Sequence, residues 1–566
     1  MSASASRHLS TGVLVIGAGG AGMYAAIEAS RLGADVLILD RSLIGRGGAT
    51  VMAQMTVAGA VGDADVERHV ADTLAAGRDL CDLRLVELLC GEAPEVIREM
   101  DEWGVGWARS GTGDGFKFVD APGHQSSRCV YVEFLATGSA VSRTLRTRLI
   151  RDQRIRRIGE LAVLELLLDG GQCTGVLALH IPSGELVTIA AKTVVLATGG
   201  LTRLYARNSA SANMGGEGYA LALRAGAELL DMEFVQFFPI GNLAPRLVGM
   251  DPIMWDAFRY KLGGRLLNGE RKEFVQGYGE PSGTYTLTRD QATYAIVKEV
   301  EAGRGSPHGG AWLSFEHCSD AALRADFGPV IDRLAKNGID LTRQAVEVAP
   351  IAHYHMGGVR VDENMATCVP GLYAAGEAVG GANGANRLSG NALSEALVFG
   401  RRAGRAAAGR AAAMHAGAWS DAAAAGAAGR YAGGRDHPPV NVAAAIVRLQ
   451  VLMANQVGPF RTAAKLVDAI DGIGALRAEI GEHPPGLGHT QNAELLDWVD
   501  LDGMLQTAEM VARSALMRDE SRGAHQREEH PMMRPEWSVN QVLSLQRGAL
   551  AVTRAAVPQP ASGVAA

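Results

Sequence analysis

The first hydrophobic run of the chain ends in glycines and is followed by a helical stretch. Val13–Ile16 has the pattern of a fully buried strand, the segment from Gly17 to Gly22 reads GAGGAG, and Met23–Arg31 is alanine-rich and helical in character. Val36–Leu39 predicts a second buried strand, which ends at Asp40. A strand, a glycine-rich turn, a helix and a strand ending in an acid are typical of a dinucleotide-binding unit. In such a unit the N-terminus of the helix offers free N–H groups to the pyrophosphate.

Two later apolar runs also end in glycine-containing turns. Thr193–Ala197 leads into Thr198-Gly199-Gly200, and Gly371–Ala375 leads into Gly376-Glu377. Both have the pattern of buried strands that end at the ligand-binding edge of an open α/β sheet. The stretch between them, from Pro239 to about Pro350, has many turn residues and mixed charge. It is too long for a structureless loop and predicts an inserted domain.

The last third of the chain has a helical pattern. From Arg402 to Gly434 the composition is dominated by Ala, Gly and Arg, which favours helix, with a mobile connector expected near Gly426–Asp436. Beyond it, apolar residues recur at helical spacing, which predicts a small helical domain. The segments with this spacing are Val442–Met453, Arg461–Ala469 and Met504–Met517. The end of the chain, from Val557, is expected to be frayed.

Composition narrows the class of protein further. The chain has 566 residues, which predicts two or three domains, and its 71 glycines cluster beside apolar runs. With 54 basic and 61 acidic residues, the basic ones scattered, it lacks the concentrated positive surface of a nucleic-acid binder. Six widely separated cysteines without a CxxC pair argue against a disulfide scaffold, a zinc site or an iron–sulfur cluster held by this chain alone. We therefore expect no metal, no membrane span and a cytoplasmic location.

The order of the motifs resembles the flavoprotein family of succinate dehydrogenase, fumarate reductase and L-aspartate oxidase over nearly the whole chain. Nine segments in one order carry the resemblance. They are VIGAGGAG, VVLATGG, DMEFVQF, DAFR, TRDQA, AHYHMGG, GLYAAGEA, GANRLSGNAL and ESRGAHQREEHP. The resemblance implies FAD as the dinucleotide and an α/β fold, in which a Rossmann-like FAD-binding domain is interrupted by an α+β capping domain and followed by a small helical domain. The domains expected are 11–240 with 351–425 for FAD, 241–350 for the cap, and 436–545 for the helical part.

The resemblance assigns a set of residues to the cofactor. The turn glycines would hold the pyrophosphate, Glu217 the adenosine ribose and Glu377 the ribityl or phosphate side. Arg41 takes the place of a small basic residue that follows Asp40, and Asn391-Ala392-Leu393 would lie along the isoalloxazine edge. The full expected set is Gly17, Gly19, Gly20, Gly22, Asp40, Arg41, Gly48, Thr50, Ala197, Thr198, Gly199, Glu217, Glu377, Asn391, Ala392 and Leu393. An ordinary solvated carboxylate is the alternative for Glu217 and for Glu377.

One position bears on how the flavin is attached. In succinate dehydrogenase the covalently bound flavin is carried by a histidine in the segment that reads GGATVMAQ here, and this chain has Ala49 at that place. Without the imidazole that bond cannot form, so the resemblance implies non-covalent FAD. It also argues against a respiratory succinate oxidase.

The family's chemistry is a hydride transfer between flavin N5 and carbon, together with a proton transfer by an arginine. Arg289 matches that arginine, and Asp256 and Arg259 match the relay beside it. An arginine is a poor acid because its usual pKa lies far above neutral pH, so it must be positioned and assisted. A surface salt bridge is the alternative for Arg289.

His353 and Arg387 match the pair that grips one substrate carboxylate. A guanidinium can bind a carboxylate through two hydrogen bonds, and the imidazole orients it. The neighbouring His355 is expected to be structural.

The other end of the substrate pocket departs from the family. Phe238 and Trp255 stand where the dicarboxylate enzymes have a histidine and a threonine. A carboxylate buried against two aromatic rings without donors would lose several kcal/mol. Succinate, fumarate and aspartate are therefore expected to be poor substrates, unless another cation supplies the missing contact.

The leading hypothesis is an FAD-dependent oxidoreductase of the CH–CH type. It would act next to one carboxylate or carbonyl, with an apolar group at the far end of the substrate. Three alternatives remain: an amino acid oxidase similar to L-aspartate oxidase, a flavoprotein subunit that requires an iron–sulfur or other electron-transfer partner, and a flavin-binding protein without turnover.

Overall fold

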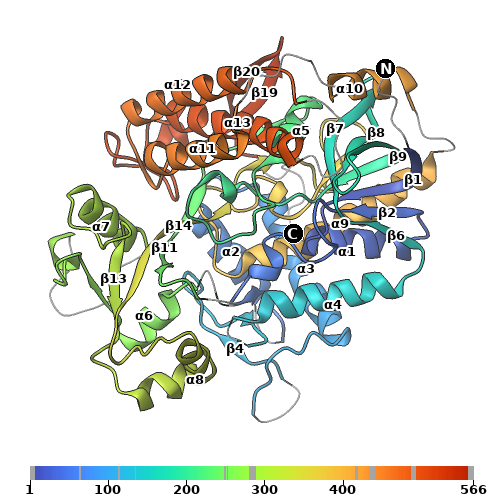
Figure 1. Cartoon of the computed structure of the whole chain (residues 1–566). Coiled ribbons are helices and arrows are strands. Elements are labelled where there is room, and N and C mark those ends of the chain that lie inside the picture. Colours follow the sequence, from blue (N-terminus) through green and yellow to red (C-terminus); the bar gives the residue numbers. More distant parts are fainter. Residues whose placement is uncertain are drawn as a thin grey trace. The chain divides into compact units, whose positions relative to one another are not determined.

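The structure is a computed structural model of the whole chain (Figure 1). It describes residues 7–62, 65–111, 115–133, 135–247, 250, 253–278, 289–414, 419–431, 440–485 and 493–558, and within these it leaves out the side chains of residues 256, 257, 260, 289, 290 and 326. The chain divides into two compact units. Unit 1 comprises Met1–Ala206, Ala210–Val235 and Tyr354–Ala566, and unit 2 comprises Arg207–Ser209 and Gln236–His353.

Unit 1 is built around a seven-stranded sheet. Its spatial order is β6 (Ile155–Ile158), β2 (Val36–Leu39), β1 (Arg7–Ile16), β9 (Glu185–Leu196), β8 (Gln172–His180) and β7 (Leu161–Asp169), and β16 (Leu372–Ala374) also pairs with β9. Strands β6, β2, β1, β9 and β16 are parallel, and β8 and β7 extend the sheet with antiparallel pairing. The carboxyl ends of β1, β9 and β16 therefore meet at one edge, as the glycine-terminated runs predict.

Two glycine- and alanine-rich helices pack closely beside this sheet (Figure 1). Helix α1 (Gly20–Arg31) begins within the glycine motif, three residues before the expected start, and α9 spans Asn391–Ala413. A Cβ added at Gly400 would lie 2.4 Å from the Ala21 carbonyl oxygen, and one at Gly404 would lie 2.3 Å from that of Ala25. These two glycines, one turn apart on α9, therefore allow the helix backbones to touch.

Two of the remaining helices in the first part of unit 1 begin at an N-cap aspartate. Asp65 accepts a hydrogen bond from Glu67 N at the start of α2 (Val66–Gly77), and Asp82 accepts one from Arg84 N at the start of α3 (Leu83–Glu102). The other elements here are α4 (Thr137–Arg151), α5 (Glu217–Arg224), the 3₁₀ turns η1 (Thr50–Met52), η2 (Thr202–Leu204) and η4 (Gly376–Ala378), and a small sheet of β3 (Val57–Ala58), β5 (Cys129–Val130) and β4 (Phe118–Val119).

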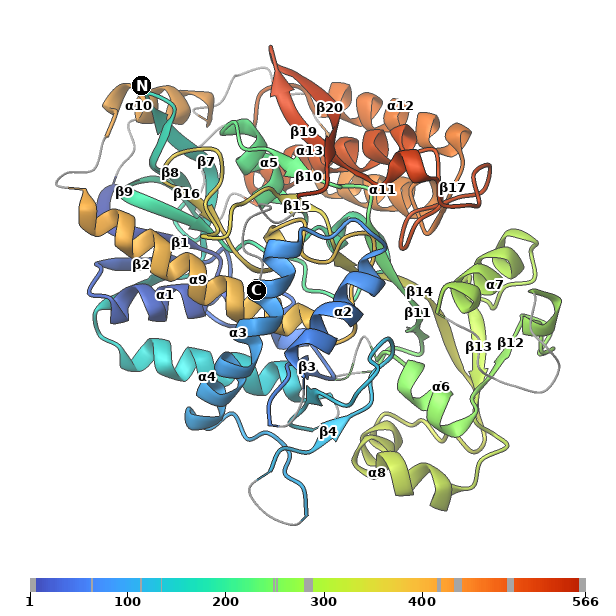
Figure 2. The same cartoon turned by 180° about the vertical axis from the view of Figure 1, so that it is seen from behind.

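The C-terminal region also belongs to unit 1, and three long helices pack together in it (Figure 2). They are α11 (Val442–Gln456), α12 (Ala463–Ile480) and α13 (Ala493–Met517). A hairpin of β19 (Val539–Gln546) and β20 (Ala549–Ala556) follows and joins β10 (Leu229–Leu230) and β15 (Gly358–Val359) in a second sheet. The shorter elements are β17 (Phe460–Arg461), β18 (Gln526–Arg527) and η5 (Pro535–Trp537). The C-terminal part is therefore helical with an added hairpin.

The expected connector near Gly426–Asp436 is wrong in its first half. Residues Gly426 and Gly429 lie inside helix α10 (Asp421–Tyr431), and the rest of the connector lies outside the described residues. The alanines explain the difference, because Ala424, Ala427, Ala428 and Tyr431 are buried in one apolar cluster with leucines of β7 and β8. This packing outweighs the low helix propensity of the glycines.

A buried ion cluster ties the ESRGAH segment to the rest of unit 1. Arg518 Nε lies 2.6 Å from Glu233 Oε1, its Nη1 lies 3.0 Å from Glu520 Oε1, and all three side chains are fully buried. Gln541 Nε2 also donates to Glu233 Oε1 at 2.8 Å. This motif therefore has a structural role in joining α13, β19 and the segment before β11.

Unit 2 is an α+β unit with its own four-stranded sheet. The strand order is β11 (Val235–Ala244), β14 (Val346–His355), β13 (Ala311–Ser314) and β12 (Arg265–Leu267), with η3 (Val275–Tyr278) and helices α6 (Asp256–Leu262), α7 (Arg289–Glu301) and α8 (Asp320–Lys336). Unit 2 contains the expected range 241–350 and extends beyond it. Residues Arg207–Ser209 belong to it because the Arg207 carbonyl accepts from Ala352 N, and Ser209 N donates to the Ala352 carbonyl.

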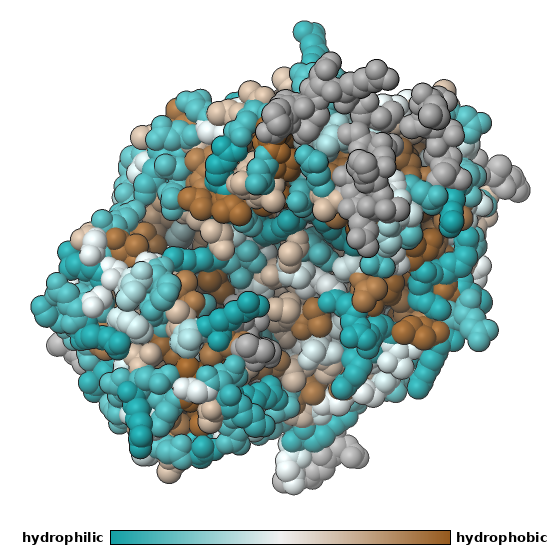
Figure 3. Space-filling view, in the orientation of Figure 1, coloured by the Kyte–Doolittle hydropathy of each residue, from teal (hydrophilic) through white to brown (hydrophobic). Residues whose placement is uncertain are grey.

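On the face shown in Figure 3, small patches of apolar residues lie between hydrophilic residues. Within the described ranges, no helix combines the length and the apolar character that a membrane crossing requires. In the same ranges, no cluster of three or more His, Cys, Asp or Glu side chains has a metal-binding arrangement.

Candidate active site

The glycine turn after β1 is shaped by close backbone contacts. Gly17 has a φ of +98°, and a Cβ there would lie 2.4 Å from the Ala197 carbonyl oxygen at the end of β9. A Cβ at Gly22 would lie 1.8 Å from the Gly17 carbonyl oxygen. Gly20 N donates to Thr50 Oγ1 at 3.0 Å, and the N-cap residue of α1, Gly19, has no side chain that could cap the helix. The turn thus presents the N-terminus of α1, where a phosphate is stabilised.

The second and third strand ends complete this edge of the sheet. Thr198 and Gly199 follow β9, and Glu377 follows β16. A Cβ at Gly200 would lie 2.3 Å from Glu377 Oε1, so the glycine leaves room for the carboxyl group. Thr198 Oγ1 is buried and has no hydrogen-bond partner among the residues that the structure describes. A buried hydroxyl is costly to leave unpaired, so this atom fits a polar group of a bound cofactor.

The Asp40 side chain forms a hydrogen bond to the glycine turn after β1. Its Oδ2 accepts from Ala18 N at 2.7 Å, and its Oδ1 accepts from Ser42 N and Ser42 Oγ, both at 2.7 Å. Both carboxylate oxygens are therefore engaged in holding the glycine loop to the end of β2. The structure gives Asp40 a positioning role, while its expected contact with the cofactor remains a prediction.

Arg41 and Glu217 lie in an ion cluster that includes a residue from the C-terminal helices. Arg41 Nη1 lies 3.1 Å from Glu217 Oε1, and its Nη2 lies 2.7 Å from Asp500 Oδ2 on α13. Arg203 Nη1 is also 2.7 Å from Asp500 Oδ2. Burial raises the pKa of Glu217, while the nearby Arg41 opposes this rise. Glu217 is therefore a partly buried, paired carboxylate and not an ordinary solvated one.

Helix α13 forms this side of the site through more than one contact. Thr507 Oγ1 donates to the Gly216 carbonyl at 3.0 Å, and a Cβ at Gly503 would lie 3.5 Å from Glu217 Cα. Asp500, Gly503 and Thr507 were not among the sequence candidates. The spacing of Asp500 from the glycine motif carries no signal, because only the docking of α13 on α5 brings it there.

Asp500 gives a first prediction. Asp500→Asn should weaken FAD binding by about 10-fold, because Arg41 and Arg203 would lose the buried carboxylate that holds them. Asp502 on the same helix pairs with Arg224 at a partly exposed position, so Asp502→Asn serves as a control and should leave FAD affinity unchanged. Titration of apoprotein with FAD, followed by quenching of flavin fluorescence, measures both. Equal affinities for the two variants would contradict the role of Asp500.

The start of α9 has the features of a second ligand-facing helix terminus. Gly390 at its N-cap has a φ of +83°, and no side chain caps the helix. The Asn391 side chain points elsewhere: its Oδ1 lies 2.9 Å from His69 Nε2, and its Nδ2 donates to Thr73 Oγ1 at 3.1 Å. Asn391 therefore anchors α9 to α2. If Asn391, Ala392 and Leu393 contact a flavin, Asn391 must do so through its backbone.

Glu377 and His355, the last residue of β14, belong to one buried network of hydrogen bonds. Glu377 Oε1 accepts from His355 N at 3.1 Å, and burial raises its pKa to about 8. The His355 ring lies between Tyr219 Oη, 3.0 Å from Nδ1, and the Met232 carbonyl, 3.1 Å from Nε2. Burial lowers the pKa of His355 to about 3, so the imidazole is neutral. The structure agrees with the expectation that His355 is structural.

These residues fit a dinucleotide cofactor. Three features lie at the carboxyl ends of β1 and β9: the start of α1 with its glycine N-cap, the Thr198 hydroxyl that is unpaired in the described part of the chain, and the space left by glycines. Of the other expected cofactor residues, Gly48 has a φ of +80° and its N–H donates to Ser211 Oγ at 2.9 Å, and Ala197 directly follows β9 beside Gly17.

The residues expected at the substrate are divided between the units. Arg387 belongs to unit 1, where its Cζ lies 4.6 Å from the centroid of the Tyr354 ring and its Nη1 donates to the Leu388 carbonyl at 3.1 Å. His353 belongs to unit 2, where its Nδ1 lies 2.7 Å from Ser209 Oγ. Strand β14 passes from one unit to the other between His353 and Tyr354.

Unit 2 places the two unusual aromatic residues in different surroundings. Phe238 is buried against Met254 and Ile351, and its ring meets that of His353 at a centroid distance of 5.6 Å. Trp255 is fully buried beside Phe258, and its Nε1 donates to Asn242 Oδ1 at 3.1 Å. Of the two, only Phe238 contacts a proposed substrate residue, whereas Trp255 lies in the core of unit 2.

The residues expected to move the proton also lie in unit 2. Arg259 is buried on α6, in which Asp256 is the first residue, and Arg289 is the first residue of α7. The side chains of Asp256 and Arg289 lie outside the described part of the structure. Their roles therefore remain predictions from the resemblance.

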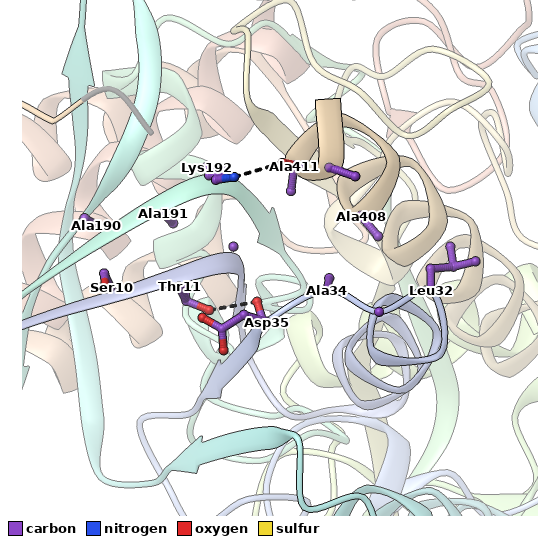
Figure 4. Close-up of a pocket in the computed structure, with 13 residues that line it drawn as sticks. Ser10, Thr11, Leu32, Ala34, Asp35, Ala190, Ala191, Lys192, Ala408 and Ala411 are labelled. Carbon is purple, nitrogen blue, oxygen red and sulfur yellow. Dashed lines mark hydrogen bonds between the residues drawn. The ribbon is translucent and has the colours of Figure 1, made fainter. Parts of the chain in front are cut away.

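A surface pocket of about 490 Å³ lies beside the middle of β1 and β9 and the start of β2 (Figure 4). It is lined by Thr11 in the first half of β1, by Asp35, and by Ala408 and Ala411 of α9. Lys192 Nζ donates hydrogen bonds to the carbonyls of Ala411, at 3.3 Å, and Met414, at 2.6 Å. The pocket lacks the residues expected in catalysis, so we do not assign the active site to it.

Comparison with known proteins matches the chain to two protein families. The FAD binding domain family matches residues 12–393, and the fumarate reductase flavoprotein C-term family matches residues 447–557. A fumarate reductase (CoM/CoB) polypeptide from Methanothermobacter marburgensis is 36% identical over 533 residues, covering 93% of this chain and 95% of that protein. An L-aspartate oxidase from Streptomyces coelicolor is 34% identical over 526 residues, covering 92% and 88%.

Solved structures agree with this relationship. The structure of Mycobacterium smegmatis Sdh1 in complex with UQ1 matches with a TM-score of 0.89 and 34% identity, covering 98% of this chain and 96% of that one. The similarity spans both units and the C-terminal helices, and it confirms the expected fold class.

Proposed function

Because the chain belongs to the flavoprotein family of succinate dehydrogenase, fumarate reductase and L-aspartate oxidase, we propose that it acts on a substrate with one carboxylate or carbonyl and an apolar far end. Family membership makes it an FAD-dependent oxidoreductase that acts on CH–CH groups. In the proposed reaction, a hydride and a proton are added to, or removed from, the C–C bond next to that carboxylate or carbonyl.

FAD, when bound, supplies the hydride chemistry. The residues of unit 1 would hold it: the glycine turn and the start of α1 suit the pyrophosphate, and the cluster of Arg41, Glu217 and Asp500 suits the adenosine end. Glu377 and the start of α9 suit the flavin end.

Arg387 and His353 would bind the substrate carboxylate. A guanidinium pairs with a carboxylate through two hydrogen bonds, and it would also stabilise the negative charge that develops on the conjugated acid as hydride is transferred. Ser209 Oγ, at 2.7 Å from His353 Nδ1, would hold the imidazole in one orientation. Arg289, assisted by Asp256 and Arg259, would hold and move the proton.

The observation that carries the substrate proposal is the surroundings of Phe238. Its ring lies against Met254 and Ile351 and beside His353, at the position where the family's dicarboxylate enzymes have a histidine. An apolar wall of this kind favours an alkyl or aryl group and disfavours a second carboxylate. We therefore expect substituted enoic acids, or their saturated counterparts, to be better substrates than fumarate or succinate.

A substrate panel tests this proposal. Photoreduced protein would be mixed anaerobically with fumarate, crotonate and cinnamate, and oxidised protein with succinate, butyrate and 3-phenylpropionate, while flavin absorbance is followed. The proposal expects faster reoxidation or bleaching by the monocarboxylates. Fastest turnover of the C4 dicarboxylates would overturn it, and release of ammonia and hydrogen peroxide from aspartate would favour an amino acid oxidase instead.

Ala49 supports non-covalent attachment of FAD. It lies at the N-cap of η1, directly before Thr50, and its methyl group offers no nucleophile. Acid precipitation should therefore leave a colourless pellet and release all of the flavin into the supernatant. Flavin that stays with the precipitated chain would contradict this proposal.

An electron-transfer partner is compatible with the family, because the relative from Methanothermobacter marburgensis is named as one subunit of its fumarate reductase. The sequence has six dispersed cysteines and no cluster motif, so an iron–sulfur partner would supply its own cluster ligands. Co-purification of the chain from its own cells with an iron-containing polypeptide tests the partner.

A further inference from the structure

A buried tyrosine and a buried glutamate next to Arg387 have no role in the function described so far. Tyr354 lies in β14 directly after His353, and Glu395 lies in the second turn of α9. Glu395 is fully buried, and the Tyr354 side chain is almost so. Both belong to unit 1, together with Arg387. Buried ionisable groups are rare unless they are paired, so this pair requires an explanation.

Tyr354 supports the guanidinium of Arg387 from one side. The Arg387 Cζ atom lies 4.6 Å from the Tyr354 ring centroid, within the range of a cation–π contact. The ring itself is packed with Leu80, Phe234 and Met356 in one apolar cluster, so it cannot easily rotate away. The contact therefore restricts where the charged end of Arg387 can lie.

Glu395 fixes the other end of the same tyrosine. The Tyr354 hydroxyl donates to Glu395 Oε2, and Asn383 Nδ2 donates to the same oxygen at 2.9 Å. Glu395 Oε1 is buried without a hydrogen-bond partner in the described part of the chain. Burial raises the pKa of Glu395, and the nearby positive charge of Arg387 opposes this rise. Tyr354 thus contacts both groups, the Glu395 carboxyl through its hydroxyl and the Arg387 guanidinium through its ring.

We propose that Tyr354 and Glu395 are positioning residues for Arg387 and set the affinity of this enzyme for the substrate carboxylate. This inference rests on the proposed role of Arg387 in binding that carboxylate. A long arginine side chain loses conformational freedom when it grips a ligand, and a guanidinium that is already held by a ring loses less. The hydroxyl bond to Glu395 keeps the ring in place, so Glu395 acts on Arg387 through Tyr354.

The proposal makes a graded prediction for three variants. Tyr354→Leu removes the ring and should weaken carboxylate binding by about 5- to 30-fold, the range that a partly desolvated cation–π contact gives. Tyr354→Phe keeps the ring but loses its anchor, and Glu395→Gln keeps an acceptor but loses the charge. Each of these two should weaken binding by a smaller factor of about 2 to 5. None of the three should remove FAD.

The test uses trans-cinnamate as the probe and its methyl ester as an uncharged analogue. Titration of the holoenzyme, followed through the flavin absorption spectrum, gives the dissociation constant of each, and steady-state kinetics with cinnamate give KM and kcat. We expect a raised dissociation constant and KM for cinnamate, a smaller fall in kcat because Arg387 would also stabilise the developing charge, and unchanged affinity for the ester. Tyr431→Phe, which changes a buried tyrosine of α10 whose hydroxyl bonds the Leu164 carbonyl, is the matched control.

The outcomes separate this inference from the proposed function. If Arg387→Leu abolishes cinnamate binding but Tyr354→Leu binds it like the unchanged enzyme, the positioning role is refuted and the carboxylate clamp stands. If Arg387→Leu binds cinnamate normally, the clamp itself fails. Equal losses for cinnamate and its ester in Tyr354→Leu would indicate general damage to the pocket and would also overturn the positioning role. If the Tyr354→Leu protein does not fold, the positioning role is tested by Tyr354→Phe, and cinnamate binding equal to that of the unchanged enzyme would then refute it.

Discussion

Replacing Gly22 with alanine should produce a protein that no longer binds FAD. The added methyl group would lie 1.8 Å from the carbonyl oxygen of Gly17, a residue that is fixed to the end of β2 because its N–H donates to the Leu39 carbonyl at 2.8 Å. Neither partner can move without separating α1 from the sheet, so we expect the unfolding free energy to fall by about 3 kcal/mol or more. The absorbance of the purified protein near 450 nm, a typical flavin band, relative to that at 280 nm, measures the cofactor content.

The matched control is Gly91→Ala. Gly91 also lies inside a helix, α3, but it is exposed and a Cβ there meets no atom within 4 Å. Alanine should raise stability at this position by roughly 0.5–1 kcal/mol, because a glycine inside a helix costs conformational entropy. Thermal unfolding of both variants gives the comparison. A yellow Gly22→Ala protein with unchanged stability would refute the packing argument.

Replacing Arg289 with alanine should remove turnover while the bound flavin keeps its spectrum. Loss of a positioned acid or base costs about 10²- to 10⁴-fold in rate, and the proposed relay through Asp256 and Arg259 cannot deliver a proton without its last member. Arg289 is the first residue of α7 in unit 2, whereas the residues that fit FAD are in unit 1. Single-turnover reoxidation of the reduced enzyme by the best acid of the panel measures the loss.

Arg343→Ala is the control for that experiment. Arg343 lies in the same unit, and its exposed side chain is near Asp340. This replacement should leave the rate unchanged, since an exposed ion pair contributes little. If Arg289→Ala reoxidises as fast as the unchanged enzyme, the proton must come from another group.

The parts of the fold that could be predicted are those encoded by neighbouring residues. The run Val13–Ile16 lies within β1, Val36–Leu39 is β2, and the glycine motif forms the turn after β1 and the first residues of α1, because apolar runs and glycine spacing act over a few residues. The connector expected at Gly426 shows the limit of this reasoning. There, contacts with the distant strands β7 and β8 outweigh the local preference of glycine.

In the candidate site, too, motifs predicted some residues, whereas other contacts depend on residues far apart in the chain. Glu217 and Arg41 could be proposed from motifs, but Asp500, which holds Arg41, lies on a helix far along the chain. Asn391 was expected to line the flavin, and its side chain instead joins α9 to α2. Trp255 was expected in a pocket wall and lies in the core of unit 2. Side-chain direction depends on what packs against an element, and no motif records that.

The sequence by itself determined the kind of cofactor, the family and the order of the parts. It could do so because tight glycine turns and strand ends need particular residues at fixed local spacing. Only the tertiary structure decided which acids pair with Arg41, how Gly400 and Gly404 bring α9 onto α1, and that Glu395 anchors Tyr354 beside Arg387. These relations join residues distant in sequence, and burial and the cost of unpaired charge select them only when the whole chain has folded.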